Sequence, residues 1–170
     1  VAVLLIAPAL TDLGVRLETA HFFVFYFAIL SALTPPVAIA CIVTTRIANA
    51  DFWKVCYKAI LIGLPLFILP YVFLENPTLL YWEFPATLFT LFVTYSGLVS
   101  ISVALVNYLG GPLSWFIRGS LIAGSFIVLF ANVFAGPYAM GVQFVGSILL
   151  IGFLLWKSNV HLSIVESVTS

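Results

Sequence analysis

The chain alternates between long, uninterrupted apolar runs and short polar links. Apolar residues dominate 19–48, 56–74, 85–107, 115–134 and 138–156. A helix needs about 20 residues to cross the ~30 Å hydrocarbon core of a bilayer, whereas a barrel strand needs about 10 residues that alternate in polarity. The runs are continuous and long. The pattern therefore predicts an all-α, polytopic bundle of transmembrane helices.

The two ends of the chain depart from this pattern. Residues 1–11 are apolar, but their first ten would cover only roughly 15 Å as a helix, about half a bilayer. We therefore expect a partial helix there, and we expect the chain to be the C-terminal part of a longer protein. Residues 159–170 are polar and predict a tail that frays.

One apolar run is interrupted in its middle by Thr34-Pro35-Pro36. Proline has no N–H to donate, and its ring clashes with the preceding helical turn. It also disfavours helical backbone in the residue before it. The sequence therefore predicts that a helix over 19–33 stops and that a new half-helix starts near Pro36, since proline suits the first turn.

Such a break frees carbonyl groups at the end of one half-helix and N–H groups at the start of the next. The carbonyls can bind Na⁺, and the N–H groups can bind a carboxylate, as in secondary transporters. Two hydroxyl groups add oxygen ligands. The alternative is a kink whose backbone groups are satisfied by neighbouring helices. The predicted ion- or substrate-binding residues are Ser31, Ala32, Leu33, Thr34, Pro35 and Pro36, with Na⁺ at Ser31 and Thr34.

Composition and charge agree with a membrane protein. Hydrophobic residues make up 64% of the chain and charged residues 7%, and the mean hydropathy is +1.24. Soluble domains carry about 25% charged residues. This composition excludes a soluble enzyme, a disordered tail and a nucleic-acid-binding protein. Cys41 and Cys56 form no CxxC motif and indicate neither a disulfide framework nor a zinc site.

The charged residues predict an orientation. Basic residues occur in every second link, and basic links of membrane proteins face the cytoplasm. This rule places residues 46–58, 107–118 and the C-terminal end in the cytoplasm, and 12–18 and 75–84 on the opposite side. The four tryptophans fall near span ends, as aromatic residues at membrane interfaces do: Trp53, Trp82, Trp115 and Trp156.

Two charged positions have local interpretations. His21 lies one helical turn after Glu18, which predicts an interfacial ion pair. The alternative is a histidine that contacts substrate or carries a proton. Asp51 precedes the next apolar run and is expected to cap its helix.

Small polar residues predict contacts between helices. Ser96, Ser100 and Ser102 are expected to hydrogen-bond across helices, and Ser120-xxx-Gly124 to allow close approach. The sequence contains no evident nucleophile–base–acid set and no paired carboxylates within a span. It therefore does not indicate an enzyme.

The residues around the break and beside it also carry a family resemblance. Residues 21–38 are HFFVFYFAILSALTPPVA, and shorter matching stretches occur at 8–15, 48–51 and 76–80. Together they resemble the large membrane subunit of TRAP (tripartite ATP-independent periplasmic) transporters, most closely the fused permeases that work with TAXI-type binding proteins. The resemblance extends over roughly residues 1–80.

The resemblance implies an elevator-type transporter built from two inverted repeats. Residues 1–80 would be the end of the second repeat, with 1–10 as the last arm of its hairpin and the proline break beside a sodium site. Residues 81–158 would be additional C-terminal transmembrane helices, and 159–170 a polar tail.

The resemblance also implies function and partners. Such a permease imports small organic carboxylates with a Na⁺ gradient across a bacterial or archaeal inner membrane and needs no other cofactor. Its partners would be a TAXI-type periplasmic binding protein, the remaining N-terminal part or small membrane subunit, and membrane lipid, but no nucleic acid. Two alternatives are a non-transporting scaffold subunit and a membrane-embedded enzyme whose active residues lie upstream.

The orientation can be tested by labelling single cysteines from outside intact cells, after replacing Cys41 and Cys56 by alanine. A membrane-impermeant maleimide should label Asn76→Cys and leave Asp51→Cys unlabelled. Strong labelling at position 51 with none at position 76 would invert the orientation.

Overall fold

The computed structural model describes the backbone of residues 2–169 and the side chains of residues 4–159. The regular secondary structure of this described part is helical, which confirms the all-α class. The chain divides into two compact units, Val1–Trp82 and Glu83–Ser170. Three described helical segments are long and apolar enough to cross a membrane: Phe52–Glu75, Ala86–Val106 and Ala131–Asn159.

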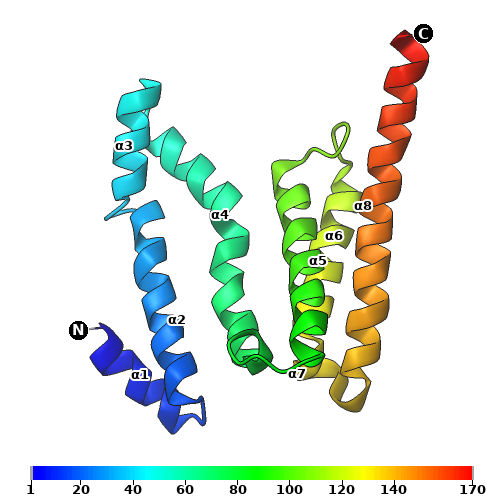
Figure 1. Cartoon of the computed structure of the whole chain (residues 1–170). Coiled ribbons are helices and arrows are strands. Elements are labelled where there is room, and N and C mark those ends of the chain that lie inside the picture. The colour runs from blue at the N-terminus through cyan, green and yellow to red at the C-terminus, as the bar shows by residue number, and fades with distance from the viewer. Residues whose placement is uncertain (1, 170) are drawn as a thin grey trace. The chain divides into compact units, whose positions relative to one another are not determined.

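In the first unit, α1 and α2 precede the non-helical residues 34–38, and α3 and α4 follow them (Figure 1). Helix α1 packs on α2, and α4 packs on both α2 and α3. Short 3₁₀ turns, η1 and η2, follow α2 and α4. The bounds are α1 Ala2–Asp12, α2 Leu17–Leu30, η1 Ser31–Leu33, α3 Ile39–Ala48, α4 Phe52–Glu75 and η2 Pro77–Leu79.

Local chemistry explains the junction between α3 and α4. Asn49 has a left-handed backbone, with φ +46°, and ends α3. Asp51 is extended, and its Oδ1 accepts a hydrogen bond of 3.0 Å from the Lys54 N–H. This contact confirms that Asp51 caps the following helix.

Aromatic side chains join α2 to α4. The rings of Phe23 and Tyr71 lie edge to face, 5.4 Å apart, and those of Phe22 and Phe73 are 5.3 Å apart. Such pairs add to the stabilisation that comes from close packing. They therefore hold the helix that precedes the interruption against the long helix α4.

A polar cluster lies at the start of α2. The Tyr81 hydroxyl donates a 3.1 Å hydrogen bond to Glu18 Oε2, and Arg16 Cζ lies 3.7 Å from the centre of the Tyr81 ring. A hydrogen bond from the Glu18 backbone lowers the pKa of this carboxyl, and the bonds and charges of Tyr81, Arg16 and His21 lower it further. Glu18 thus contacts Tyr81 rather than forming the expected ion pair with His21.

The second unit is built on three packed helices (Figure 1). Helices α5, α6 and α8 contact one another in pairs, and α7 packs on α8. The buried core contains Val93, Leu121, Val128 and Leu150. The bounds are α5 Ala86–Val106, α6 Trp115–Leu129, α7 Ala131–Ala135, η3 Gly136–Tyr138 and α8 Ala139–Thr169.

Three expectations for the second unit are corrected. The run 115–134 is not one helix, because α6 ends at Leu129 and Phe130 is not helical. The C-terminal residues do not leave the helix, since α8 continues to Thr169. The serine hydroxyls of α5 donate within their own helix rather than across helices: Ser96 to Val93 O, Ser100 to Ser96 O and Ser102 to Leu98 O.

Glycine allows the closest helix contacts in this unit. A Cβ atom on Gly97 of α5 would lie 2.6 Å from Leu129 Cγ of α6, and one on Gly146 of α8 would overlap Val128 of α6. At Gly124 the corresponding distance, to Leu150 Cδ2, is 3.4 Å. The predicted pair Ser120-xxx-Gly124 therefore faces α8, but Gly97 and Gly146 are the tighter sites.

Gly97→Ala should destabilise the second unit. The added methyl group overlaps Leu129, and overpacking of this kind costs about 1–3 kcal/mol, against a gain of about 1 kcal/mol in helix propensity. The matched control is Gly152→Ala in α8, whose Cβ would meet nothing within 4 Å. Thermal unfolding in detergent, followed by circular dichroism, should show a lower midpoint for Gly97→Ala alone. An equal or higher midpoint would show that Leu129 moves aside freely.

The Glu18 cluster predicts a pH dependence. The folded-state pKa of Glu18 lies below its ordinary value of 4.5. Its contacts therefore stabilise the fold fully above that pH, and their contribution is lost as the pH falls through the folded-state pKa. Tyr81→Phe removes the hydroxyl and keeps the ring beneath Arg16.

This variant should melt below the wild type at pH 7, and the difference should shrink at pH 3. The hydroxyl effect should also be absent in a Glu18→Gln background. A difference between wild type and Tyr81→Phe that does not change with pH would show that the Glu18 contact adds nothing to stability.

Candidate functional site

The candidate site is the non-helical segment between η1 and α3. Thr34 is extended, with φ −113° and ψ 136°, and no regular helix covers residues 34–38. Ala38 has a left-handed backbone, with φ +39°, before α3 begins at Ile39. The second helix thus starts three residues after Pro36, later than expected. Ala38 and Pro36 belong to the turn rather than to the first helical turn.

The two predicted hydroxyl groups, those of Ser31 and Thr34, both donate hydrogen bonds to backbone carbonyls. Ser31 Oγ donates a 2.6 Å hydrogen bond to Ala28 O. Thr34 donates to Ser31 O from its N–H, at 3.2 Å, and more weakly from Oγ1, at 3.5 Å. A hydroxyl oxygen that donates its proton keeps two lone pairs. Both oxygens therefore keep the electron pairs that a cation would bind.

A cysteine connects the two sides of the segment. Cys41 of α3 places its Sγ 3.4 Å from Leu33 O at the end of η1, and the thiol is the donor. Cys41 and Cys56 of α4 are both buried and share a small apolar cluster with Ala38. The sequence pattern predicted no such role for either cysteine. The contact joins residues on either side of the non-helical segment, so helical periodicity does not predict it.

The predicted site residues differ in how far they are exposed. Ser31, Ala32, Leu33, Thr34 and Pro35 are half-buried, and Pro36 is exposed. An apolar cavity of about 350 Å³ adjoins the segment, lined by Tyr26, Ile29, Leu30, Ala32, Leu33 and Leu66. The site therefore offers backbone and hydroxyl oxygens next to an apolar surface.

His21 is not brought to this segment. It is exposed near the start of α2, ten residues before Ser31, which corresponds to about 15 Å of helix. Within the residues that the structure describes, no group of three or more His, Cys, Asp or Glu side chains is placed to hold a metal ion. The chemistry available at the segment is therefore that of neutral oxygen ligands.

Comparison with known proteins identifies the family. A family model for the tripartite ATP-independent periplasmic transporter, DctM component, matches residues 1–88, which is more than half of the chain. No curated protein and no solved structure gives a significant match. The matched region contains the candidate site and all of the first compact unit. This chain therefore belongs to the DctM component, the large membrane component, of the TRAP transporter family.

Proposed function

We propose that the chain forms part of a Na⁺-coupled permease that imports small organic carboxylates delivered by a periplasmic binding protein of the TAXI type. Membership of the family supports a TRAP permease component. The observation that carries the finer proposal is the non-helical segment 34–38 inside an apolar unit, with the Thr34 hydroxyl at its first residue and the Ser31 hydroxyl three residues earlier.

The segment suits cation binding for a physical reason. Irregular backbone within the hydrocarbon region is tolerated where it lines protein or a water-filled cavity, because bare backbone groups cost several kcal/mol there. Ser31 Oγ and Thr34 Oγ1 would supply neutral oxygen ligands, together with backbone carbonyls of residues 31–34. Neutral oxygen ligands hold Na⁺ without the charge that would also attract divalent ions.

The start of α3 would bind the anionic group of the substrate. Helix α3 begins at Ile39, and its first-turn N–H groups carry the positive end of the helix dipole. A substrate carboxylate near this end would be stabilised at the same time as Na⁺ at the preceding hydroxyls. This arrangement would couple the two solutes, because each favours the other electrostatically.

We place the chain in a bacterial or archaeal inner membrane, with residues 46–58 on the cytoplasmic side. Residues 1–80 would form the end of the second inverted repeat of the permease, and the first repeat would come from the rest of the transporter. Residues 81–158 would be helices added to that common permease.

Thr34→Ala should weaken Na⁺ activation without preventing membrane insertion. Loss of one neutral ligand costs about 1–2 kcal/mol, which corresponds to roughly 5- to 30-fold in apparent Na⁺ affinity. The measurement is the initial uptake rate against Na⁺ concentration in proteoliposomes that contain the assembled transporter and its cognate binding protein.

The matched control is Thr44→Ala in α3. Thr44 Oγ1 donates to Ala40 O at 2.8 Å within its own helix, so its removal should leave the Na⁺ curve unchanged. Pro35→Ala combined with Pro36→Ala should let a helix form through the segment, and transport should fail even at saturating Na⁺. The ion-site proposal is wrong if Thr34→Ala leaves Na⁺ activation unchanged and the double variant transports normally.

A further inference from the structure

The proline pair deprives two carbonyl groups of helical donors. A helical carbonyl accepts from the N–H group four residues later, and a 3₁₀ carbonyl from the one three residues later. For Ala32 O both of these positions are prolines, Pro35 and Pro36, which have no N–H group. Leu33 O loses the donor three residues later, because that residue is Pro36. The break therefore leaves the oxygens of residues 32 and 33 short of backbone donors.

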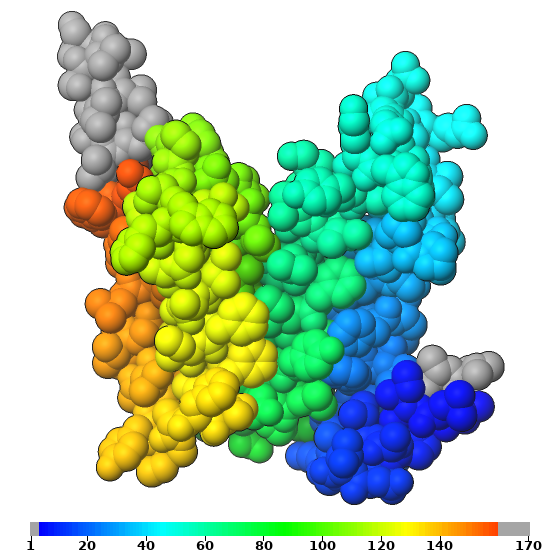
Figure 2. Space-filling model, turned by 180° about the vertical axis from the view of Figure 1, so that it is seen from behind, coloured from blue at the N-terminus to red at the C-terminus, as the bar shows by residue number. Residues whose placement is uncertain are grey.

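Cys41 of α3 supplies a donor to one of these two oxygens. Its Sγ lies 3.4 Å from Leu33 O, and the thiol donates. Figure 2 shows the cyan α3 above the light-blue end of α2, with the blue-green α4 beside both. The thiol thus reaches back across the non-helical segment 34–38, from the helix that follows the break to the end of the turn that precedes it.

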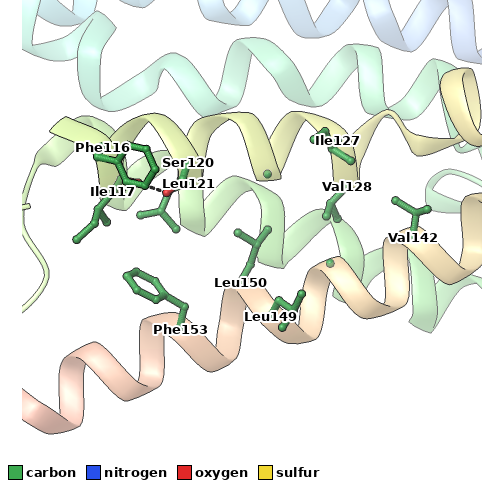
Figure 3. Close-up of a pocket in the computed structure, with 12 residues that line it drawn as sticks. Phe116, Ile117, Ser120, Leu121, Ile127, Val128, Val142, Leu149, Leu150 and Phe153 are labelled. Carbon is green, nitrogen blue, oxygen red and sulfur yellow. Dashed lines mark hydrogen bonds between the residues drawn. The ribbon is translucent and has the colours of Figure 1, made fainter. Parts of the chain in front are cut away.

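This contact differs from the hydroxyl contacts inside the helices. Ser120 of α6, for example, donates to Ile117 O of its own helix at 2.9 Å, drawn as a dashed line in Figure 3. Such a bond adds a second donor to a carbonyl of a helical ladder. The Cys41 contact instead spans eight residues and ends on a carbonyl at the break. It therefore controls an oxygen that the helix leaves short of donors.

Burial fixes the thiol beside this carbonyl. Cys41 is 1% exposed and packs with Ala38 and Cys56 in a small apolar cluster. The Thr45 hydroxyl donates to Cys41 O at 2.7 Å within α3. Cys56 of α4 is equally buried, at 2% exposed, but the thiol that contacts Leu33 O is that of Cys41. The two cysteines therefore share an environment and differ in their contact with the break.

The strength of the donor matters to a cation at the same oxygen. The S–H hydrogen carries a small positive partial charge directed at Leu33 O, and this charge opposes an approaching cation. A hydroxyl donor carries more positive charge and would oppose the cation more strongly. Without a donor, both lone pairs of the carbonyl oxygen would be open to the ion.

We propose that Cys41 sets the affinity of the Na⁺ site, because its thiol holds Leu33 O in a weak hydrogen bond with which the ion competes. This inference rests on the proposed function, in which Na⁺ binds oxygens of residues 31–34. Cys41 does not touch the ion; it is a positioning residue that acts through Leu33. The Na⁺ requirement of uptake should therefore be lowest without a donor at position 41, intermediate with the thiol and highest with a hydroxyl.

The test is the initial uptake rate against Na⁺ concentration, in proteoliposomes that contain the assembled transporter and its binding protein. Cys41→Ala should lower the Na⁺ concentration for half-maximal uptake about threefold, and Cys41→Ser should raise it about threefold, the factor that a modest hydrogen bond supplies. Rates at saturating Na⁺ should stay close to that of the wild type. Cys56→Ala removes the same atom from the same cluster and should leave the Na⁺ curve unchanged.

Infrared spectroscopy reads the bond itself. The chain contains two cysteines, so the S–H stretching band of Cys41 can be measured in Cys56→Ala and identified by its loss when Cys41→Ala is added. This band should be that of a hydrogen-bonded thiol. Added Na⁺ should shift it toward that of a free thiol, whereas choline should not.

The outcomes separate this inference from the proposed function. Wild-type uptake that does not depend on Na⁺ would refute the proposed function, and the role of Cys41 with it. Na⁺-dependent uptake in which Cys41→Ala needs as much Na⁺ as the wild type, or Cys41→Ser needs no more, would refute the role of Cys41 alone. An S–H band that ignores Na⁺ would do the same. An equal shift of the Na⁺ curve in Cys56→Ala would overturn the inference in favour of packing within the cluster.

Discussion

Backbone hydrogen bonding in a medium without water is the constraint on which this structure depends. In hydrocarbon each unsatisfied N–H or C=O costs several kcal/mol, so a spanning chain must satisfy these groups internally. The described helices do so along most of their lengths, although Pro8 of α1 and Pro65 and Pro70 of α4 donate no N–H. The segment 34–38 leaves the helical conformation, with Pro35 and Pro36 adjacent in it. Substitute bonds satisfy part of the backbone there: the Thr34 N–H donates to Ser31 O, the Ala38 N–H to Thr34 O, and the Cys41 thiol to Leu33 O.

These substitutes explain why the segment is both ordered and chemically available. A thiol is a weak donor, and a hydroxyl that donates keeps its lone pairs. Ser31 O and Thr34 O accept from backbone N–H groups, as carbonyls of a helix do, whereas Leu33 O accepts from the Cys41 thiol, a weaker donor. The oxygens of Ser31 and Thr34 thus lie in a short set of local bonds rather than in a continuous helical ladder. The same proline pair interrupts the helix and leaves these oxygens beside the interruption.

Sequence patterns predicted the features that depend on near neighbours in the chain. The apolar runs predicted helices, and the residue type of Asp51 predicted a cap that the structure contains. The predicted helix boundaries were less accurate where the backbone of a single residue sets the helix end. Ala38 adopts a positive φ before α3, and Phe130 leaves the helical conformation after α6. The serines of α5 bond within their helix because the carbonyls at i−3 and i−4 lie within reach of each hydroxyl.

Contacts between distant residues lay outside what the patterns could predict. Tyr81 and Glu18 are 63 residues apart, and only the folding of the first unit brings them together. The candidate site was predicted through its prolines, but the Cys41 contact was not, since a buried cysteine reads as a small apolar residue in sequence. The ion-binding role of Ser31 and Thr34 stays a prediction.

Proline and glycine modify the helices of the two units in different ways. Proline removes a backbone donor, so the first unit gains a polar discontinuity beside its half-buried hydroxyls. Glycine removes a side chain and leaves the backbone ladder intact, so the helices of the second unit approach closely at Gly97 and Gly146. The first change suits a small ion or a carboxylate, and the second suits tight packing between helices. The chemistry that each unit offers therefore follows from which backbone property its special residues remove.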